Sequence, residues 1–194
     1  MNILHIDSSI MDTESVSKKL TAAVVAQLKQ QHTDAEVTYL DLDQNPVGHL
    51  SGTALMSPTA EQMALSDRLI EQYLNADVLV LGVPMYNFTV PSTLKAWFDH
   101  VLVARRTFRY TAEGVEGLAG DKKVYLVSSR GGVYGDEHAL DFQEGFVRTA
   151  LGFTGVTDIE VIRAEGVNLS PESKQQAISQ AALQVEGLGL AAAV

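Results

Sequence analysis

The stretch Val-Leu-Val-Leu-Gly-Val-Pro-Met-Tyr-Asn-Phe, residues 78–88, decides the fold class. Its first six residues are almost wholly apolar, so a strand built from them is buried on both faces, as in the centre of a parallel sheet. Pro84 ends the strand, because proline has no N–H to donate to a neighbouring strand. The sequence therefore predicts a central parallel strand that runs directly into a loop of large side chains.

Shorter strand and helix patterns alternate on either side of this stretch. Strands are predicted at 3–6, 37–40, 124–127 and 157–162, and helices begin at Val16, Ser57-Pro58, about Leu94, about Phe142 and Ser170-Pro171. Consecutive parallel strands need a covering helix between them, with right-handed crossovers. We therefore expect one domain, residues 1–194, with an α/β doubly wound fold. Five strands favour a flavodoxin-like parallel sheet with helices on both faces, and 105–121 is predicted to be an irregular insertion.

Composition limits the chemistry. The 194 residues include 14 Lys and Arg against 24 Asp and Glu, a formal net charge of -10, so neither nucleic acid nor an anionic membrane is an expected partner. There is no cysteine, which excludes disulfides, thiol nucleophiles and iron–sulfur clusters, so redox chemistry needs a bound cofactor. Residues 1–7 have no basic leader and no apolar run approaches the length of a membrane span. A cytoplasmic protein is expected.

Ligands of open α/β sheets bind beyond the carboxyl ends of the strands, so the loops there are the places to look for a site. The first such loop, 8–17, carries Ser9, Ser15 and Ser17 and leads into a helix, whose N-terminal amides can hold a terminal phosphate. It lacks the glycine patterns of dinucleotide and triphosphate loops. The alternative is that Ser15 only caps the helix.

Two further loops at this edge are unusual. Residues 85–88 are Met, Tyr, Asn and Phe, which suit a flat aromatic ligand whose polar edge bonds Asn87 and nearby amides; alternatively, Tyr86 and Phe88 fold back onto the core. The sequence Ser-Arg-Gly-Gly at 129–132 lets the backbone approach a ligand closely, although it also fits an ordinary turn with Arg130 in solvent.

Together these motifs resemble the FMN-dependent NADH-azoreductases, also described as NADH:quinone oxidoreductases. The resemblance runs from Asn2 to about Ala182 and rests on residues 8–10, 15–17, 76–88, 107–111, 129–132 and 151–155. It implies a homodimer with non-covalently bound FMN at the carboxyl edge of the sheet. NADH is then the electron donor, and quinones or aromatic azo compounds are the acceptors.

The resemblance also implies roles for particular residues. The FMN phosphate is held by Ser9, Ser15, Val16 and Ser17. The isoalloxazine is wrapped by Met85, Tyr86, Asn87 and Phe88, and its other edge is lined by Ser129, Arg130, Gly131 and Gly132. Tyr110 and Phe153 match positions that wall the substrate pocket, one of them across the dimer. Arg105-Arg106 and a short 46–58 loop depart from the family pattern and put the outer pocket in question.

The reaction implied is a two-step, ping-pong hydride transfer from NADH to FMN and then to a quinone or an azo bond, giving hydroquinone or aromatic amines. The flavin carries the chemistry, so no catalytic side chain and no metal are expected. Two alternatives stay open: a flavodoxin-type electron carrier, and an NAD(P)H-dependent reductase of free FMN.

Other groups favour structural interpretations. The acids and histidine at 136–144 suit the start of a helix better than a metal site, Trp97 and Phe98 suit the core or a dimer contact, and His100 suits the surface or an interface. Residues 93–130 carry seven basic and four acidic side chains, against seven and twenty elsewhere. We expect this net-basic segment to attract NADH.

Overall fold

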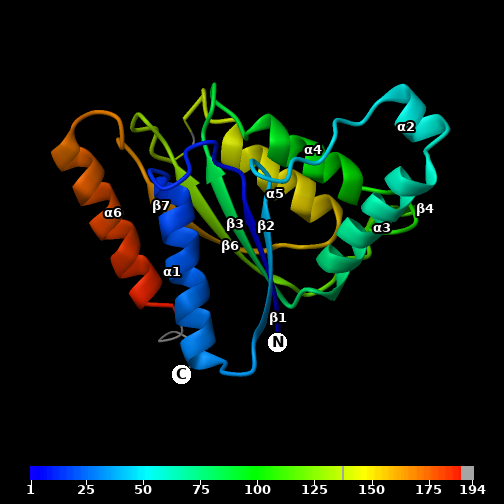
Figure 1. Cartoon of the computed structure of the whole chain (residues 1–194), viewed down its shortest axis with the longest axis horizontal. Helices are drawn as coiled ribbons and strands as arrows, with labels where there is room; N and C mark the ends of the chain where they lie inside the picture. The colour runs from blue at the N-terminus through cyan, green and yellow to red at the C-terminus, as the bar shows by residue number, and fades with distance from the viewer. Residues whose placement is uncertain (137, 189–194) are drawn as a thin grey trace.

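A computed structural model describes residues 1–136 and 138–188 (Figure 1). Its centre is a five-stranded, all-parallel sheet in the order β2-β1-β3-β6-β7. The strands are β1 (Asn2–Asp7), β2 (Glu36–Asp41), β3 (Val78–Pro84), β6 (Lys123–Ser129) and β7 (Asp158–Ala164). This order is the flavodoxin-like one, so the predicted fold class is confirmed.

Helices cover both faces of the sheet (Figure 1). On one face lie α1 (Val16–Gln31) and α6 (Pro171–Glu186); on the other lie α3 (Ala60–Asn75), α4 (Ser92–Val101) and α5 (Gln143–Phe153). The short α2 (Gly52–Met56) precedes α3. None of the described helices is long and apolar enough to cross a bilayer.

Strand β3 explains why the apolar stretch forms the centre of the sheet. Leu79 and Leu81 pack into the core beneath α3, α4 and α5, whereas Val78 and Val80 pack into the core beneath α1 and α6. The one glycine of the stretch, Gly82, has no room for a side chain, since a Cβ there would lie 2.3 Å from Oδ1 of the buried Asp7. The stretch is therefore built for burial on both faces.

Helix α4 contributes the largest buried side chain of the protein. Trp97 is 0% exposed, packs edge-to-face on Tyr73 and Phe98, and lies in the core with them. The expectation of a core role for Trp97 and Phe98 is confirmed. His100, near the end of the same helix, is half-buried, and its Nε2 lies 2.9 Å from the carbonyl oxygen of Gly48.

Two predicted elements differ from the structure. Helix α3 does not begin at Ser57-Pro58: Thr59 is its N-cap, because Thr59 and Gln62 satisfy each other's backbone amides at 3.2 and 2.9 Å, and a reciprocal box outweighs a single cap. Nor is 105–121 irregular throughout. It contains an antiparallel hairpin of β4 (Phe108–Thr111) and β5 (Gly114–Gly117).

The hairpin lies at the amino edge of the sheet. Helix α4 runs back from the carboxyl edge before it, and β6 begins directly after it. Its end is fixed to the end of α5, where the amide of Ala119 donates to the carbonyl of Thr154 at 3.0 Å. The insertion is therefore placed at the opposite edge from the loops predicted to bind a ligand.

Candidate functional site

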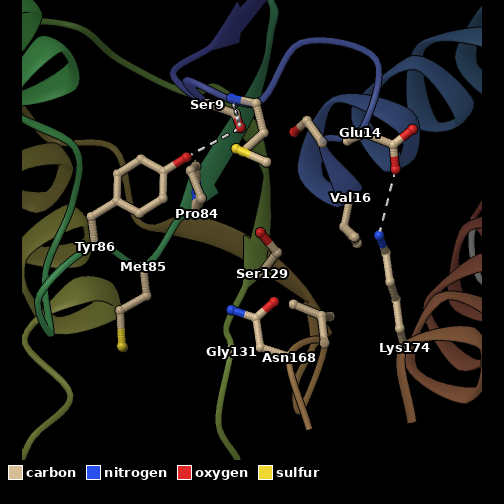
Figure 2. A pocket seen from close by; sticks show the side chains of 13 residues that line it. Ser9, Glu14, Val16, Pro84, Met85, Tyr86, Ser129, Gly131, Asn168 and Lys174 are labelled. Atoms are coloured by element: carbon tan, nitrogen blue, oxygen red, sulfur yellow. Dashed lines mark hydrogen bonds and ion pairs between the residues drawn. The ribbon is translucent and has the colours of Figure 1, made fainter. Parts of the chain in front are cut away.

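A cavity of about 270 Å³ opens at the carboxyl ends of β1, β3, β6 and β7 (Figure 2). It lies at the point where the strand order reverses between β1 and β3, which is where ligands of open α/β sheets bind. Seven residues predicted for the site line it: Ser9, Ser15, Val16, Met85, Tyr86, Ser129 and Gly131. All three predicted loops therefore meet at one cavity.

The start of α1 forms one wall. Ser15 is the N-cap, since its Oγ accepts from the amide of Lys18 at 3.1 Å, and the same residue also lines the cavity. The same Oγ lies 3.2 Å from Oγ of the fully buried Ser17, which holds Ser17 behind Ser15. The buried amides of Val16 and Ser17 have no acceptor within the described chain. A helix end of this kind favours an anion, because its free N–H groups carry partial positive charge.

Tyr86 joins the first loop to the second. Its hydroxyl lies 3.3 Å from Ser9 Oγ and accepts from the amide of Ile10 at 3.2 Å, and Figure 2 shows its ring at the side of the cavity. Phe88 is 46% exposed. The alternative in which these two rings fold back onto the core is therefore wrong.

The second loop is a strained turn. Tyr86 and Thr89 exchange both backbone hydrogen bonds, at 3.0 and 3.2 Å, and the two residues between them have positive φ, 48° for Asn87 and 72° for Phe88. Two positive φ values mark a type I′ turn, which costs non-glycine residues about 1 kcal/mol or more each. Such strain clusters at binding sites.

A second cavity, of about 870 Å³, lies on the far side of this turn. It shares Met85 and Tyr86 with the first and also contacts Asn87 and Phe146. The amide of Phe142, just before α5, donates to the carbonyl of Phe88 at 3.0 Å and steadies the turn. The turn therefore separates two openings, and a ligand in either one would touch it.

The third loop is fixed from behind by Arg130. Its side chain is 0% exposed and points away from the cavity toward three carboxylates, those of Asp141 at 2.7 Å, Glu144 at 2.5 Å and Glu165 at 3.1 Å. The alternative of Arg130 in solvent is wrong, because the guanidinium is itself buried and paired with all three carboxylates. The backbone, and not this side chain, faces the cavity.

Gly131 shows how closely the loop packs. A Cβ at this position would lie 2.8 Å from Nδ2 of Asn168, and the carbonyl of Gly131 accepts from the amide of Asn168 at 3.1 Å. The loop after β6 and the loop after β7 are thus joined edge to edge, and Asn168 lines the cavity beside Gly131.

The acids at the start of α5 have the structural role expected of them. Oδ1 of Asp141 accepts from the amides of Gln143 at 2.9 Å and Glu144 at 3.4 Å, which satisfies the helix start. Glu144 also pairs with Arg163, and this hydrogen bond raises the pKa of the Arg163 guanidinium. Glu137 lies outside the described residues, and residues 1–136 and 138–188 hold no group of three or more His, Asp or Glu side chains placed to bind a metal ion.

Five residues predicted for cofactor binding do not line the first cavity: Ser17, Asn87, Phe88, Arg130 and Gly132. Four of them are next to a residue that does, and Phe88 is two residues from Tyr86. Tyr110 and Phe153 are elsewhere, at the amino edge of the sheet, where both rings pack on Phe108 with centroids 5.7 and 4.7 Å apart. Within one subunit they are not part of this site.

The net-basic segment is not free charge beside the site. Six of its seven basic side chains are already partnered: Lys95 by Asp99, Arg106 by Asp67, Arg109 by Glu116, Lys122 by the carbonyls of Leu74 and Ala76, Lys123 by Asp158 and Glu160, and Arg130 by its three carboxylates. Residues 105–121 also lie at the opposite edge. These pairings reduce the charge that the segment can offer within one subunit, and its attraction of NADH stays a prediction.

Sequence reasoning missed the fourth wall of the cavity. Asn168 and Lys174 line it from the loop after β7 and the first turn of α6, and Glu14 lines it from the first loop. The strand near 157–162 was predicted, and its carboxyl end lies at the same edge, so its following loop carried the same signal as the other three.

Comparisons with known proteins agree with this fold. A family model described as flavodoxin-like fold matches residues 1–188. The FMN-dependent NADH:quinone oxidoreductase of Azospirillum brasilense is 49% identical, covering 98% of both chains, and that of Rhizobium meliloti is 49% identical, covering 93% of both. Among solved structures, an azoreductase from Bacillus anthracis str. Sterne has a TM-score of 0.87 at 30% identity, covering 95% of this chain and 96% of that one.

A second solved structure is similar in fold. It is an FMN-dependent NADH-azoreductase from Bacillus anthracis str. Ames Ancestor in complex with FMN. It has a TM-score of 0.82 at 24% identity, covering 97% of this chain and 99% of that one.

Proposed function

Because the chain belongs to the flavodoxin-like family of FMN-dependent NADH:quinone oxidoreductases and azoreductases, we propose that it carries out a two-step, ping-pong oxidoreduction at the cavity described above. NADH binds first and leaves as NAD⁺, and a quinone or an aromatic azo compound then binds in the same place. The quinone leaves as hydroquinone, and the azo compound, after two rounds, as aromatic amines. FMN, when bound, supplies the hydride chemistry.

The start of α1 fits the FMN phosphate. The free amides at the start of α1 and the hydroxyls of Ser9 and Ser15 supply hydrogen-bond donors at one end of the cavity. The buried hydroxyl of Ser17 lies 3.2 Å from Ser15 Oγ and supports it from behind. The absence of a glycine-rich loop between β1 and α1 suits a single terminal phosphate better than a pyrophosphate.

The turn after β3 fits the flat ring system. Met85 and Tyr86 supply apolar wall on the cavity side, and the strained turn presents the backbone and side chain of Asn87 toward a ring lying across it. The strain holds these groups in place before the cofactor arrives, which reduces the ordering cost of binding. Phe88, exposed in one subunit, would cover the ring edge.

The glycine loop fits the other edge of the ring. The side chain of Arg130 is withdrawn into its carboxylate cluster, so Ser129, Gly131 and Gly132 can approach a ring with backbone alone. Arg130 therefore contributes to the cofactor site through its backbone and through the rigidity it gives the loop. No side chain is required as an acid or base, since the protein orients the reactants and excludes water.

Tyr110 and Phe153 would reach the substrate only from a second subunit, because their own subunit places them at the opposite edge of the sheet. We therefore propose a homodimer in which each flavin face is walled partly by the partner. Multi-angle light scattering of the purified protein checks this, and a monomer with full activity would contradict it.

The observation that carries the proposed function is the convergence of the three predicted loops on one cavity at the sheet's switch point. The purified protein should be yellow or bind added FMN, and stopped-flow mixing with NADH should bleach the flavin within one turnover. A flavodoxin-type carrier would be reduced slowly or not at all without a separate reductase.

Steady-state kinetics separate the remaining alternative. A retained flavin that serves NADH and the acceptor in turn gives parallel double-reciprocal lines. Intersecting lines with FMN released as a product would favour a reductase of free FMN.

A further inference from the structure

One pair of opposite charges stands at the rim of the cavity. Among the described residues that line it, Lys174 is the only cation and Glu14 the only anion. Figure 2 shows the two side chains reaching toward each other, from the first turn of α6 and from the loop before α1. Their Nζ and Oε2 atoms are 3.8 Å apart.

The pair is loose. A separation of 3.8 Å exceeds the range of a hydrogen bond, whereas the other lysine–carboxylate pairs of the described chain lie at 2.5 to 3.2 Å. The Glu14 side chain is 71% exposed and that of Lys174 37% exposed, so water screens their attraction. Glu14 is therefore a weak partner that a stronger anion can replace.

The backbone that carries Lys174 is nevertheless fixed. Ser170 caps α6 by accepting from the amide of Ser173 at 3.1 Å, and the amide of Lys174 donates to the carbonyl of Ser170 at 3.0 Å. The flexible four-carbon side chain of Lys174 is therefore attached to a fixed backbone. The ammonium can change partners without any movement of the fold.

A phosphate at the start of α1 would meet an incomplete set of charges without this lysine. The amides of Val16 and Ser17 and the hydroxyl of Ser15 are donors, but none carries a full positive charge. A phosphate monoester carries about -1.5 to -2 at neutral pH. Lys174 supplies the one full positive charge on the lining, and Glu14 repels the same phosphate.

We propose that Lys174 exchanges Glu14 for the phosphate of the bound flavin, and that this pair sets the preference for FMN over riboflavin. The inference rests on the proposed function, because it takes the flavin phosphate to lie at the start of α1. It assigns a binding role to Lys174 and an opposing one to Glu14.

Equilibrium titrations followed by flavin fluorescence test the role of Lys174. Lys174→Gln should weaken FMN binding about tenfold and change riboflavin binding less than about twofold, because only FMN has a charged partner for the ammonium. Lys19→Gln is the matched control: it removes the same charge from an exposed position on α1 that does not line the cavity. Lys19→Gln should leave the FMN-to-riboflavin ratio near that of the wild type.

Glu14→Gln should act in the opposite direction. Removing the competing carboxylate should tighten FMN binding by about threefold and leave riboflavin unchanged, and raising the salt concentration should shrink the effect. Asp12→Asn, in the same exposed loop but off the lining, is its control. Changes of opposite sign in FMN affinity are not expected if the pair only stabilises the fold, because its loss would then weaken the binding of FMN and riboflavin alike.

The outcomes separate this inference from the proposed function. A wild-type protein that binds neither flavin overturns both. If the wild-type protein binds FMN, three results overturn the inference alone. They are an FMN Kd of Lys174→Gln equal to that of the wild type, an equal weakening of FMN and riboflavin binding by Lys174→Gln, and weaker FMN binding by Glu14→Gln.

Discussion

Replacing Arg130 with methionine should be among the most damaging single substitutions in this protein. The Arg130 side chain is 0% exposed, its Nε donates to Ser128 and Gln143, and its two terminal nitrogens meet the carboxylates of Asp141, Glu144 and Glu165. Methionine fills much of the volume but leaves these acids without their shared counter-ion. Removing one partner of a buried ion pair costs about 3–5 kcal/mol of unfolding free energy.

Arg163→Met is the matched control. Its side chain is 35% exposed and pairs with Glu144 and with Asp136, which is 83% exposed. Arg163 is partly exposed and Glu144 keeps its pair with Arg130, so this variant should lower the free energy of unfolding by only about 1 kcal/mol. Arg130→Lys keeps the charge but cannot reach three carboxylates with one ammonium, and it should fall between the two.

Urea unfolding at pH 7, followed by circular dichroism, measures these differences in the free energy of unfolding. A loss below about 1 kcal/mol, or an equal loss for Arg163→Met, would refute the reasoning that burial makes Arg130 the anchor of this loop.

Three further predictions follow from the described contacts. Ser17→Asp should weaken FMN binding at least about tenfold by setting a carboxylate beside the proposed phosphate, whereas Ser17→Ala should weaken it much less. Flavin fluorescence titration compares the two variants, and equal Kd values would show that the phosphate does not bind beside Ser17. Burial raises the pKa of Tyr73 to about 12 from its ordinary 10.0. The unfolded chain therefore loses the phenol proton first, and the stability that the protonated Tyr73 contributes below pH 10 should be lost as pH rises toward 12. That loss amounts to up to about 2.7 kcal/mol, and urea unfolding at pH 8 and 11 should show a smaller pH dependence in Tyr73→Phe than in the wild type. Asn87→Gly should raise stability by up to about 1 kcal/mol by relieving its φ of 48°, yet weaken FMN binding by removing the side-chain amide; a rise in both thermal midpoint and affinity would contradict the role given to Asn87.

The fold was predictable because its main signal is strong and local. Residues 78–83 are apolar on both faces, and only the centre of a helix-covered parallel sheet buries both. The start of α3 was not predictable from single residues, because Ser57 and Thr59 are equally good caps and the choice depends on Gln62 reaching back to Thr59. The hairpin was missed because each of its strands has only four residues and most of these are exposed.

The site was predictable as far as the backbone positions and no further. The chain order places the ends of β1, β3 and β6 at one edge, so the loops that follow had to meet. The direction of the Arg130 side chain was not accessible, because its three carboxylates come from positions 141, 144 and 165, which only folding brings together. The region of Lys174 was accessible, because it follows the loop after β7, but its loose pairing with Glu14 was not.

These two basic residues show what the overall charge of -10 does and does not imply about the site. Arg130 lies in one of the loops proposed to bind the ligand, yet its charge is neutralised inside the protein by three carboxylates. Its contribution is to make that wall of the cavity rigid. Lys174 is only loosely bound to Glu14, so its charge is still available to a ligand. A count of charges along the sequence favours Arg130 and the segment around it. The pairing seen in the structure favours Lys174, because a basic side chain can attract an anionic cofactor only if the fold has not already given it a closer partner.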